Sequence, residues 1–217
     1  NCRHSSITVF SFHPVKIITA GEGGIAITND PVLAEAMSDL RSHGITKEAT
    51  RFVQSSPGPW AYEQQLLGFN YRMTDIHAAL GLSQLSRLDD IVNERNRQLN
   101  RYRHLLVDLP VRLLDIPADV VSSVHLAVII LKKSTPEQHR SVFEGLRAAG
   151  IGVQLHYIPV HLHPYYRDLG FDKGFFPVAE AFSSSAISLP IFPGLTDDQQ
   201  NRVVQVLAES LLLHGLI

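Results

Sequence analysis

The sequence predicts an α/β protein, because segments typical of strands alternate with segments typical of helices along the chain. Its composition agrees with that class. The 217 residues are 45% hydrophobic and 18% charged, as in an ordinary globular protein that can bury a sizeable core. A long polar helix followed by a proline break in mid-chain indicates two domains, residues 1–107 and 108–217.

The first domain is expected to open with two strands. Residues 7–12 are rich in β-branched and aromatic side chains and predict a buried strand. A second strand is predicted over 25–28. The glycine-rich segment 21–24 between them is typical of a tight turn, since glycine tolerates positive φ.

Helices dominate the rest of the first domain. Asp30 and Pro31 suit an N-cap and a first helical position, so a helix is predicted from there to about Ser42. Residues 45–72 show no helical or strand period. An ordered loop of that length usually carries a function or covers a partner. From 74 to 106 the apolar spacing predicts one continuous helix.

The second domain is expected to be a smaller α+β unit. Threonine followed by proline at 135–136, and glycine at 150, supply start and stop signals for its first helix. The expected elements are, in order, a strand over 124–131, a helix over 135–150, a short strand over 152–157, a loop over 158–176, a helix over 178–184, a strand over 186–189 and a last helix over 196–213.

Charge and hydropathy disfavour two classes of partner. Nineteen Lys and Arg against 21 Asp and Glu give a formal net charge of −2, so we expect no nucleic-acid partner. The mean hydropathy is only +0.04 and no apolar run has the length of a membrane span, so we expect no membrane partner. The one cysteine, Cys2, cannot form an internal bridge, which suits the reducing cytoplasm.

Histidines are abundant, but their pattern does not predict a metal site. His156, His161 and His163 share one segment, yet cysteine is almost absent and no complete zinc ligand set is evident. Histidines on predicted helices, His77 and His139 among them, are expected at the surface or at the boundary of the core.

The sharpest chemical feature is Lys16, which follows a predicted buried strand in a mostly apolar neighbourhood. Burial disfavours a charged ammonium, and a lysine that forms an imine must react as the neutral amine. Ser11 lies shortly before it and could offer a hydroxyl to an anion held beside the lysine. Taken alone, such a residue is more often a surface lysine at the end of a strand.

The segment 11–16 with the glycines of 21–24 resembles the lysine segment of the DegT/StrS sugar aminotransferases, which are fold-type-I enzymes that use pyridoxal phosphate (PLP). Two further segments agree in order: 68–85, which begins Gly-Phe-Asn-Tyr-Arg, and 153–161, which contains His-Tyr-Ile-Pro. Within this family, the amino-acid sequences of segments 68–85 and 153–171 are most similar to the enzymes of the pseudaminic-acid branch. That branch aminates a UDP-linked 4-keto-6-deoxy-N-acetyl sugar.

This resemblance implies roles for individual residues. Lys16 would bind PLP through an imine and shuttle a proton, and Ser11 would donate to the cofactor phosphate. Asn70 would reach the phosphate in the neighbouring subunit of a homodimer, with Arg72 in a supporting role. L-glutamate would be the amino donor. The residues implied for binding the nucleotide-sugar substrate are Arg72, His156, Tyr157, His161 and Tyr165.

The resemblance also implies that this chain is the C-terminal part of such an enzyme: a remnant of the large mixed-sheet domain plus the small α+β domain. The aspartate that pairs with the pyridine nitrogen is expected roughly 25 to 30 residues before the lysine, but only 15 residues precede Lys16 and residues 1–12 contain no acidic substitute. We therefore expect the isolated chain to be inactive and to expose a sheet edge and core face. The alternatives are an aminotransferase for a dTDP-linked or pentose keto-sugar, and a non-catalytic module for sugar-nucleotide binding or dimerisation.

Overall fold

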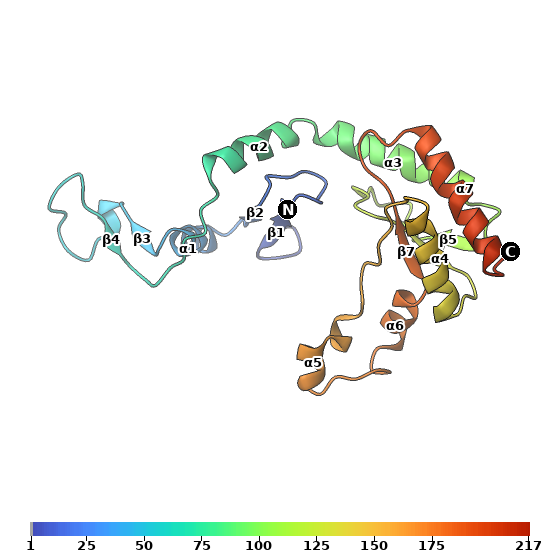
Figure 1. Ribbon diagram of the computed structural model, residues 1–217. Coiled ribbons are helices and arrows are strands. Elements are labelled where there is room, and N and C mark those ends of the chain that lie inside the picture. Colours follow the sequence, from blue (N-terminus) through green and yellow to red (C-terminus); the bar gives the residue numbers. More distant parts are fainter. Residues whose placement is uncertain (1) are drawn as a thin grey trace. The chain divides into compact units, whose positions relative to one another are not determined.

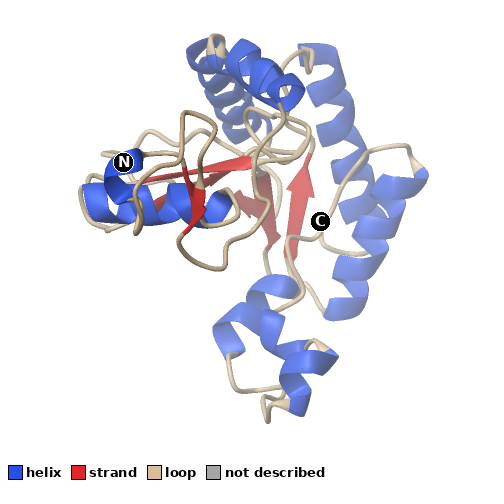
Figure 2. Cartoon of the chain, turned by 90° about the vertical axis from the view of Figure 1, so that its left-hand side faces the viewer, coloured by secondary structure: helices blue, strands red, loops and turns tan. Residues whose placement is uncertain are grey.

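The computed structural model describes residues 2–217, which form two compact units that divide after Leu88 (Figures 1 and 2). The sequence placed the boundary near residue 107 instead. The difference lies in helix α3 (Leu88–Leu105), whose side chains Leu99 and Tyr102 belong to the core of the second unit. This helix looks polar in sequence, but its narrow apolar stripe is enough to attach it to that core.

The first unit begins with an antiparallel strand pair, β1 (Thr8–Ser11) and β2 (Gly24–Ile27). The strands lie close to the predicted positions, but the prediction that the first is buried is wrong. Val9 is 73% exposed and Phe10 45% exposed. A two-stranded ribbon has no second layer among residues 2–88 to cover it, which agrees with the expected exposure of a core face.

Helix α1 (Pro31–Arg41) begins where the sequence predicts. The Asp30 carboxylate accepts hydrogen bonds from the backbone N–H groups of Val32 (2.8 Å) and Leu33 (3.4 Å), which identifies it as the N-cap. The following long segment is not structureless. It contains β3 (Ile45–Thr46), the 3-10 turn η1 (Ala49–Arg51) and β4 (Glu63–Gln64), with β3 and β4 paired antiparallel.

The helix predicted over 74–106 is two helices, α2 (Asp75–Leu85) and α3, separated by a turn at Ser86 and Arg87. The Ser86 hydroxyl donates to the carbonyl of Ser83 (3.0 Å), and the Arg87 N–H bonds to the carbonyl of Gln84 (3.1 Å). A serine that bonds to a nearby carbonyl competes with the regular helical pattern. The apolar spacing continues through this turn, which is why periodicity alone did not reveal it.

The second unit is built on a three-stranded antiparallel sheet in the order β5 (Val111–Leu113), β6 (Ala127–Leu131) and β7 (Ala186–Leu189). The sequence analysis missed β5 and started β6 three residues too early, because Val124 has φ +52° and cannot extend the strand. Residues 152–157 do not form the predicted strand. Their backbone instead forms an isolated bridge to β7, between Gln154 and Ser188.

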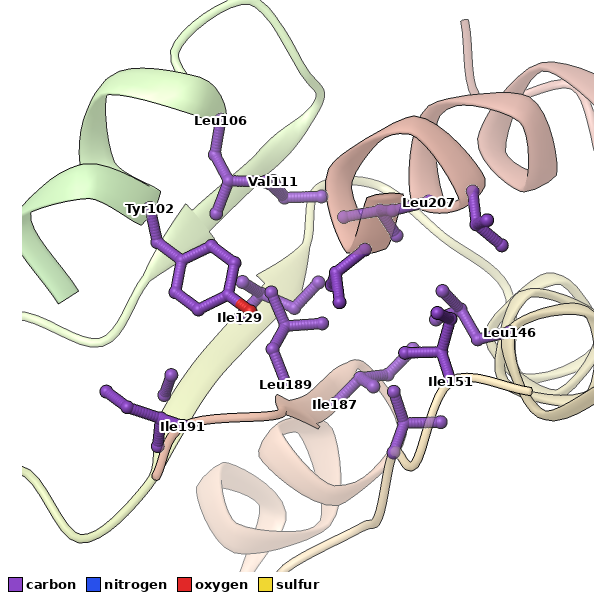
Figure 3. Packing of buried hydrophobic residues seen from close by; sticks show 14 of the residues in the cluster. Tyr102, Leu106, Val111, Ile129, Leu146, Ile151, Ile187, Leu189, Ile191 and Leu207 are labelled. Atoms are coloured by element: carbon purple, nitrogen blue, oxygen red, sulfur yellow. The ribbon is translucent and has the colours of Figure 1, made fainter. Parts of the chain in front are cut away.

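The core of the second unit lies between this sheet and three helices, α3, α4 (Pro136–Ala148) and α7 (Asp197–Leu213) (Figure 3). Alternate residues of β6 point into it, as expected for a strand with one face on a core. His139 of α4, expected at the surface or at the boundary of the core, is buried, and its Nε2 lies 2.9 Å from the Ala186 carbonyl of β7. The fully buried members include Tyr102, Ile129, Val142, Leu146, Ile187, Leu207 and Leu211.

Between Val153 and β7 the chain forms an excursion with three short helical elements, drawn below the sheet in Figure 1. They are η2 (Val160–Leu162), α5 (Pro164–Asp168) and α6 (Pro177–Ser183), of which only α6 was predicted. In the described part of the chain, no helix combines the length and apolar character needed to cross a membrane.

Candidate active site

Lys16 lies in the loop that connects β1 to β2. The loop is closed at its base, since the Phe12 N–H donates to the Gly23 carbonyl (2.9 Å) and the Phe12 carbonyl accepts from Ala20 N–H (3.0 Å). The Lys16 side chain is half-buried. Ser11 is the last residue of β1, with an exposed side chain. The hairpin therefore brings the amine-bearing and hydroxyl-bearing candidates onto one element.

Asn70 is held beside the C-terminal end of α1. The backbone N–H of Phe69 donates to the carbonyl of Leu40 (2.7 Å), and that of Tyr71 donates to the carbonyl of Arg41 (2.9 Å). These two bonds fix the backbone on both sides of Asn70 while its side chain stays exposed. The Phe69 and Tyr71 rings stack with centroids 4.8 Å apart, which stiffens the segment further.

Arg72 follows on the same segment, with an exposed side chain. Asn70 and Arg72 thus lie together in the first unit, on a segment that leads directly into α2.

We expect Gly68→Ala to displace the Asn70 segment. A Cβ at this position would overlap the backbone of His43 and Gly44, which cannot move aside as a flexible side chain could. The substitution should destabilise the protein by about 1–3 kcal/mol, as for other overpacked sites. Urea unfolding of the two proteins measures this. Gly152→Ala is the matched control, since a Cβ there would meet nothing within 4 Å; equal losses in both variants would contradict the steric explanation.

His156 and Tyr157 belong to the second unit. The His156 Nδ1 lies 2.9 Å from the Ser188 hydroxyl of β7, and burial lowers the pKa of His156 below its ordinary value of 6.5. The imidazole is therefore neutral near pH 7, and Nε2 is the ring nitrogen left to contact a ligand. Tyr157 is exposed and lines an apolar groove of about 610 Å³ together with Phe175 and Phe176.

His161 and Tyr165 lie farther along the same excursion. His161 is buried, with Nε2 2.9 Å from a carboxylate oxygen of Glu180 and its ring against that of Phe176. The same Glu180 oxygen accepts from the backbone N–H of Gly174 (2.8 Å). The His161–Glu180 pair therefore connects η2 to the first turn of α6. The Tyr165 ring remains exposed on α5.

The order of the 160–180 excursion should depend on pH. The His161 hydrogen bond, helped by the backbone N–H of Gly174, holds the pKa of Glu180 below its ordinary 4.5. A carboxyl with a lowered folded-state pKa stabilises the fold above pH 4.5, and this contribution is lost as the pH falls below 4.5 through the lowered value. Hydrogen exchange of amides 160–176, corrected for intrinsic rates, should therefore accelerate in that range.

Glu180→Gln should remove this dependence, because the amide does not titrate. Glu209→Gln on α7 is the matched control and should leave the dependence unchanged. Identical pH profiles for Glu180→Gln and the parent would refute the assignment.

The candidate residues thus divide into two groups, one in each unit. Lys16, Ser11, Asn70 and Arg72 lie in the first unit, and His156, Tyr157, His161 and Tyr165 in the second. Within residues 2–217, no cluster of three or more His, Cys, Asp or Glu side chains could hold a metal ion. Sequence reasoning overlooked Met73 and His77, whose side chains lie against glycines that follow Lys16.

Comparison with known proteins identifies the family. Residues 2–208 match the DegT/DnrJ/EryC1/StrS aminotransferase family. The chain belongs to this family. Among curated family relatives, it is 38% identical to MJ1066 of Methanocaldococcus jannaschii over 91% of its own length. It is 34% identical to the spore coat polysaccharide biosynthesis protein SpsC of Bacillus subtilis over 93%. It spans about half of each relative, 52% and 53% respectively.

Solved structures of family members agree. The PMP form of Spr1654 from Streptococcus pneumoniae superposes with a TM-score of 0.89 at 31% identity, over 97% of this chain and 54% of that one. Helicobacter pylori PseC, an aminotransferase involved in pseudaminic acid biosynthesis, superposes with a TM-score of 0.87 at 30% identity, over 96% and 54%. The fold is therefore that of about half of a fold-type-I sugar aminotransferase, as predicted.

PLP is the cofactor of this family, and Spr1654 has been solved in both its PLP and PMP forms. The first unit has donors suited to it. Lys16 offers a half-buried amine, while Ser11 and Asn70 offer an exposed hydroxyl and an exposed amide that can donate to phosphate oxygens. The residues present therefore fit the cofactor.

Proposed function

We propose that the protein carrying this chain is a PLP-dependent aminotransferase that converts the keto group of a nucleotide-linked 4-keto-6-deoxy sugar to an amine, with L-glutamate as donor. The proposal is carried by the position of Lys16 in the loop 12–23 of a chain of this family. Backbone hydrogen bonds of Phe12 close the base of this loop. The proposed site of action is the cytoplasm, which suits a chain whose one cysteine is unpaired.

The residues of the first unit would bind and orient the cofactor, which supplies an electron sink when bound. The Lys16 amine would hold it covalently and then, once released, carry a proton on Nζ between donor and acceptor carbons. Ser11 and Asn70 would fix the phosphate by donating hydrogen bonds. Arg72, which lies on the segment of Asn70, would support that contact.

Asn70 is proposed to act on the neighbouring subunit of a homodimer. Its support is the exposed segment around it: Phe69 is 52% and Tyr71 72% exposed, although their rings stack on each other. Stacked aromatic side chains that remain exposed are typical of surfaces that become covered by a partner.

The residues of the second unit would bind the sugar nucleotide. His156 offers a neutral ring nitrogen for a sugar or phosphate group, and Tyr157 lines an apolar groove that can receive a flat or apolar part of the substrate. His161 would act by holding this excursion in place through Glu180, and Tyr165 offers an exposed phenol nearby in sequence. A UDP-linked N-acetyl sugar of the pseudaminic-acid type is the proposed substrate, supported by the similarity to PseC.

Borohydride trapping with peptide mapping tests the cofactor assignment on the full-length gene product and on residues 1–217 alone. Reduction converts a PLP imine into a stable adduct on one lysine. We expect the label on Lys16 in the full-length product and not in the shorter chain. Random labelling of other lysines, with Lys16 unlabelled in the full-length product, would refute the proposal and favour a non-catalytic module.

A substrate panel tests the sugar. With L-glutamate present, the full-length product should aminate a UDP-linked 4-keto-6-deoxy-N-acetyl sugar faster than a dTDP-linked 4-keto sugar or a pentose analogue. The reverse order would retain the aminotransferase and replace the proposed substrate.

A further inference from the structure

The direction in which Lys16 emerges depends on the base of its loop. Three hydrogen bonds close that base on Phe12: its N–H donates to Gly23, and its carbonyl accepts from the N–H of Ala20 and the hydroxyl of Thr19, each at 2.9–3.0 Å. Residues 13–19 extend from this closure. A movement of the base therefore moves Lys16 with it.

Helix α2 and the residue before its N-cap lie directly on this base. The His77 ring has Cδ2 and Nε2 at 3.5 and 3.6 Å from the position that a Cβ of Gly21 would occupy. The Met73 methyl group occupies the space that a Cβ on Gly23 would need. A Cβ on Gly81 would lie 3.6 Å from the Ala20 methyl group. Contacts from successive turns of one segment thus cover Ala20, Gly21 and Gly23.

The glycines of the loop and the side chains that pack on them are complementary in shape. Gly21 and Gly23 have φ of +81° and +147°, which a side chain adopts only with strain, so glycine is required at this turn. The absent side chains leave space that Met73 and His77 fill. Methionine adapts well to an irregular gap, and the flat imidazole lies along the exposed backbone.

The segment that makes these contacts is itself fixed. Thr74 caps α2 by accepting a hydrogen bond from the His77 N–H (3.2 Å). This bond holds the first turn of α2, and with it the backbone of His77, in one conformation.

We propose that Met73 and His77 are positioning residues for Lys16: by packing on the glycines at the base of its loop, they set where the amine meets the cofactor. The proposal rests on the proposed function in one respect, namely that Lys16 is the PLP-binding lysine. Neither residue touches the reacting atoms, and both act through the loop.

The test compares Met73→Ala, Met73→Leu and His77→Ala in the full-length gene product, with Ser83→Ala as the control. Ser83 is exposed on the same helix, and its side chain is not part of the packing on the loop. Two quantities are measured. They are the rate of borohydride-trapped PLP labelling at Lys16 relative to the parent, and the hydrogen exchange of the Phe12 and Ala20 amides relative to the amides of α1.

We expect both alanine variants to lower labelling at Lys16 between about 10- and 100-fold, in line with the cost of small misplacements at reacting groups. The Phe12 and Ala20 amides should exchange faster in the same variants. Met73→Leu should recover most of the labelling because it refills the gap, and Ser83→Ala should match the parent. Folding is checked by circular dichroism of each variant.

Parent-like labelling and exchange in both alanine variants would overturn the positioning role. So would equally accelerated exchange of the α1 amides, since that would indicate general unfolding of the first unit. If the parent itself is not labelled at Lys16, the proposed function fails and the role proposed here falls with it. If only the positioning role is wrong, the parent is still labelled at Lys16 and the alanine variants behave like it. The two failures are therefore distinguishable.

Discussion

Replacing Lys16 by arginine is expected to abolish PLP labelling and to lower the turnover of the full-length gene product by at least about 10³-fold. Arginine retains the positive charge and nearly the length of lysine, but its guanidinium does not lose a proton under working conditions and cannot form an imine. The measurement is single-turnover amination together with peptide mapping after borohydride reduction.

Lys47→Arg is the matched control. Lys47 is exposed in the first unit, next to β3, and should be replaceable without effect on turnover. Lys16→Arg protein that still carries a label on another single lysine and turns over at the parental rate would show that the covalent role lies elsewhere.

Arg95→Ala is expected to destabilise the second unit by about 3–5 kcal/mol, because it leaves buried carbonyl groups without a donor. Arg95 is only 5% exposed, and its Nη1 donates to the carbonyls of Val124 (3.1 Å), His125 (3.4 Å) and Ile191 (3.1 Å). These carbonyls precede β6 and follow β7, so one side chain connects both strands to α3. Burial lowers the pKa of Arg95 below its ordinary value, which reflects the cost of placing a charge there.

Urea unfolding followed by circular dichroism measures the loss. Arg103→Ala serves as the control and should change stability little, since Arg103 is an exposed residue of the same helix whose side chain donates to the nearby Asn100. A stability change for Arg95→Ala no larger than that of the control would mean that water replaces the guanidinium without cost.

Helix starts were the most predictable part of this fold, because their signals are local. Thr135 and Thr196 each form a complete capping box, with the glutamine three residues later bonding back to the cap. The family was also predictable, since the segment around Lys16 resembles it over several consecutive residues. The predictions that failed involve contacts between distant residues. Strand β5 exists because Val111–Leu113 pairs with β6, which nothing in three residues of sequence reveals.

The same limit applies to side chains. Arg95 looks like one more polar residue of a polar helix, and its burial depends on Ile191, almost a hundred positions away. Met73 and His77 carry no motif that points to the lysine loop. Their proposed role follows from the two glycines that they meet in the folded chain.

The open β1–β2 ribbon affects how this chain behaves when produced alone. Both outer edges present backbone N–H and C=O groups that no other strand among residues 2–217 pairs, and Val9, Phe10 and Ile25 stand exposed beside them. Such a ribbon is a template for strand addition, so copies should associate through it and scatter light increasingly as the concentration rises. A lysine in place of Val9 should reduce this self-association, because a charge on an edge strand disfavours pairing with a second copy.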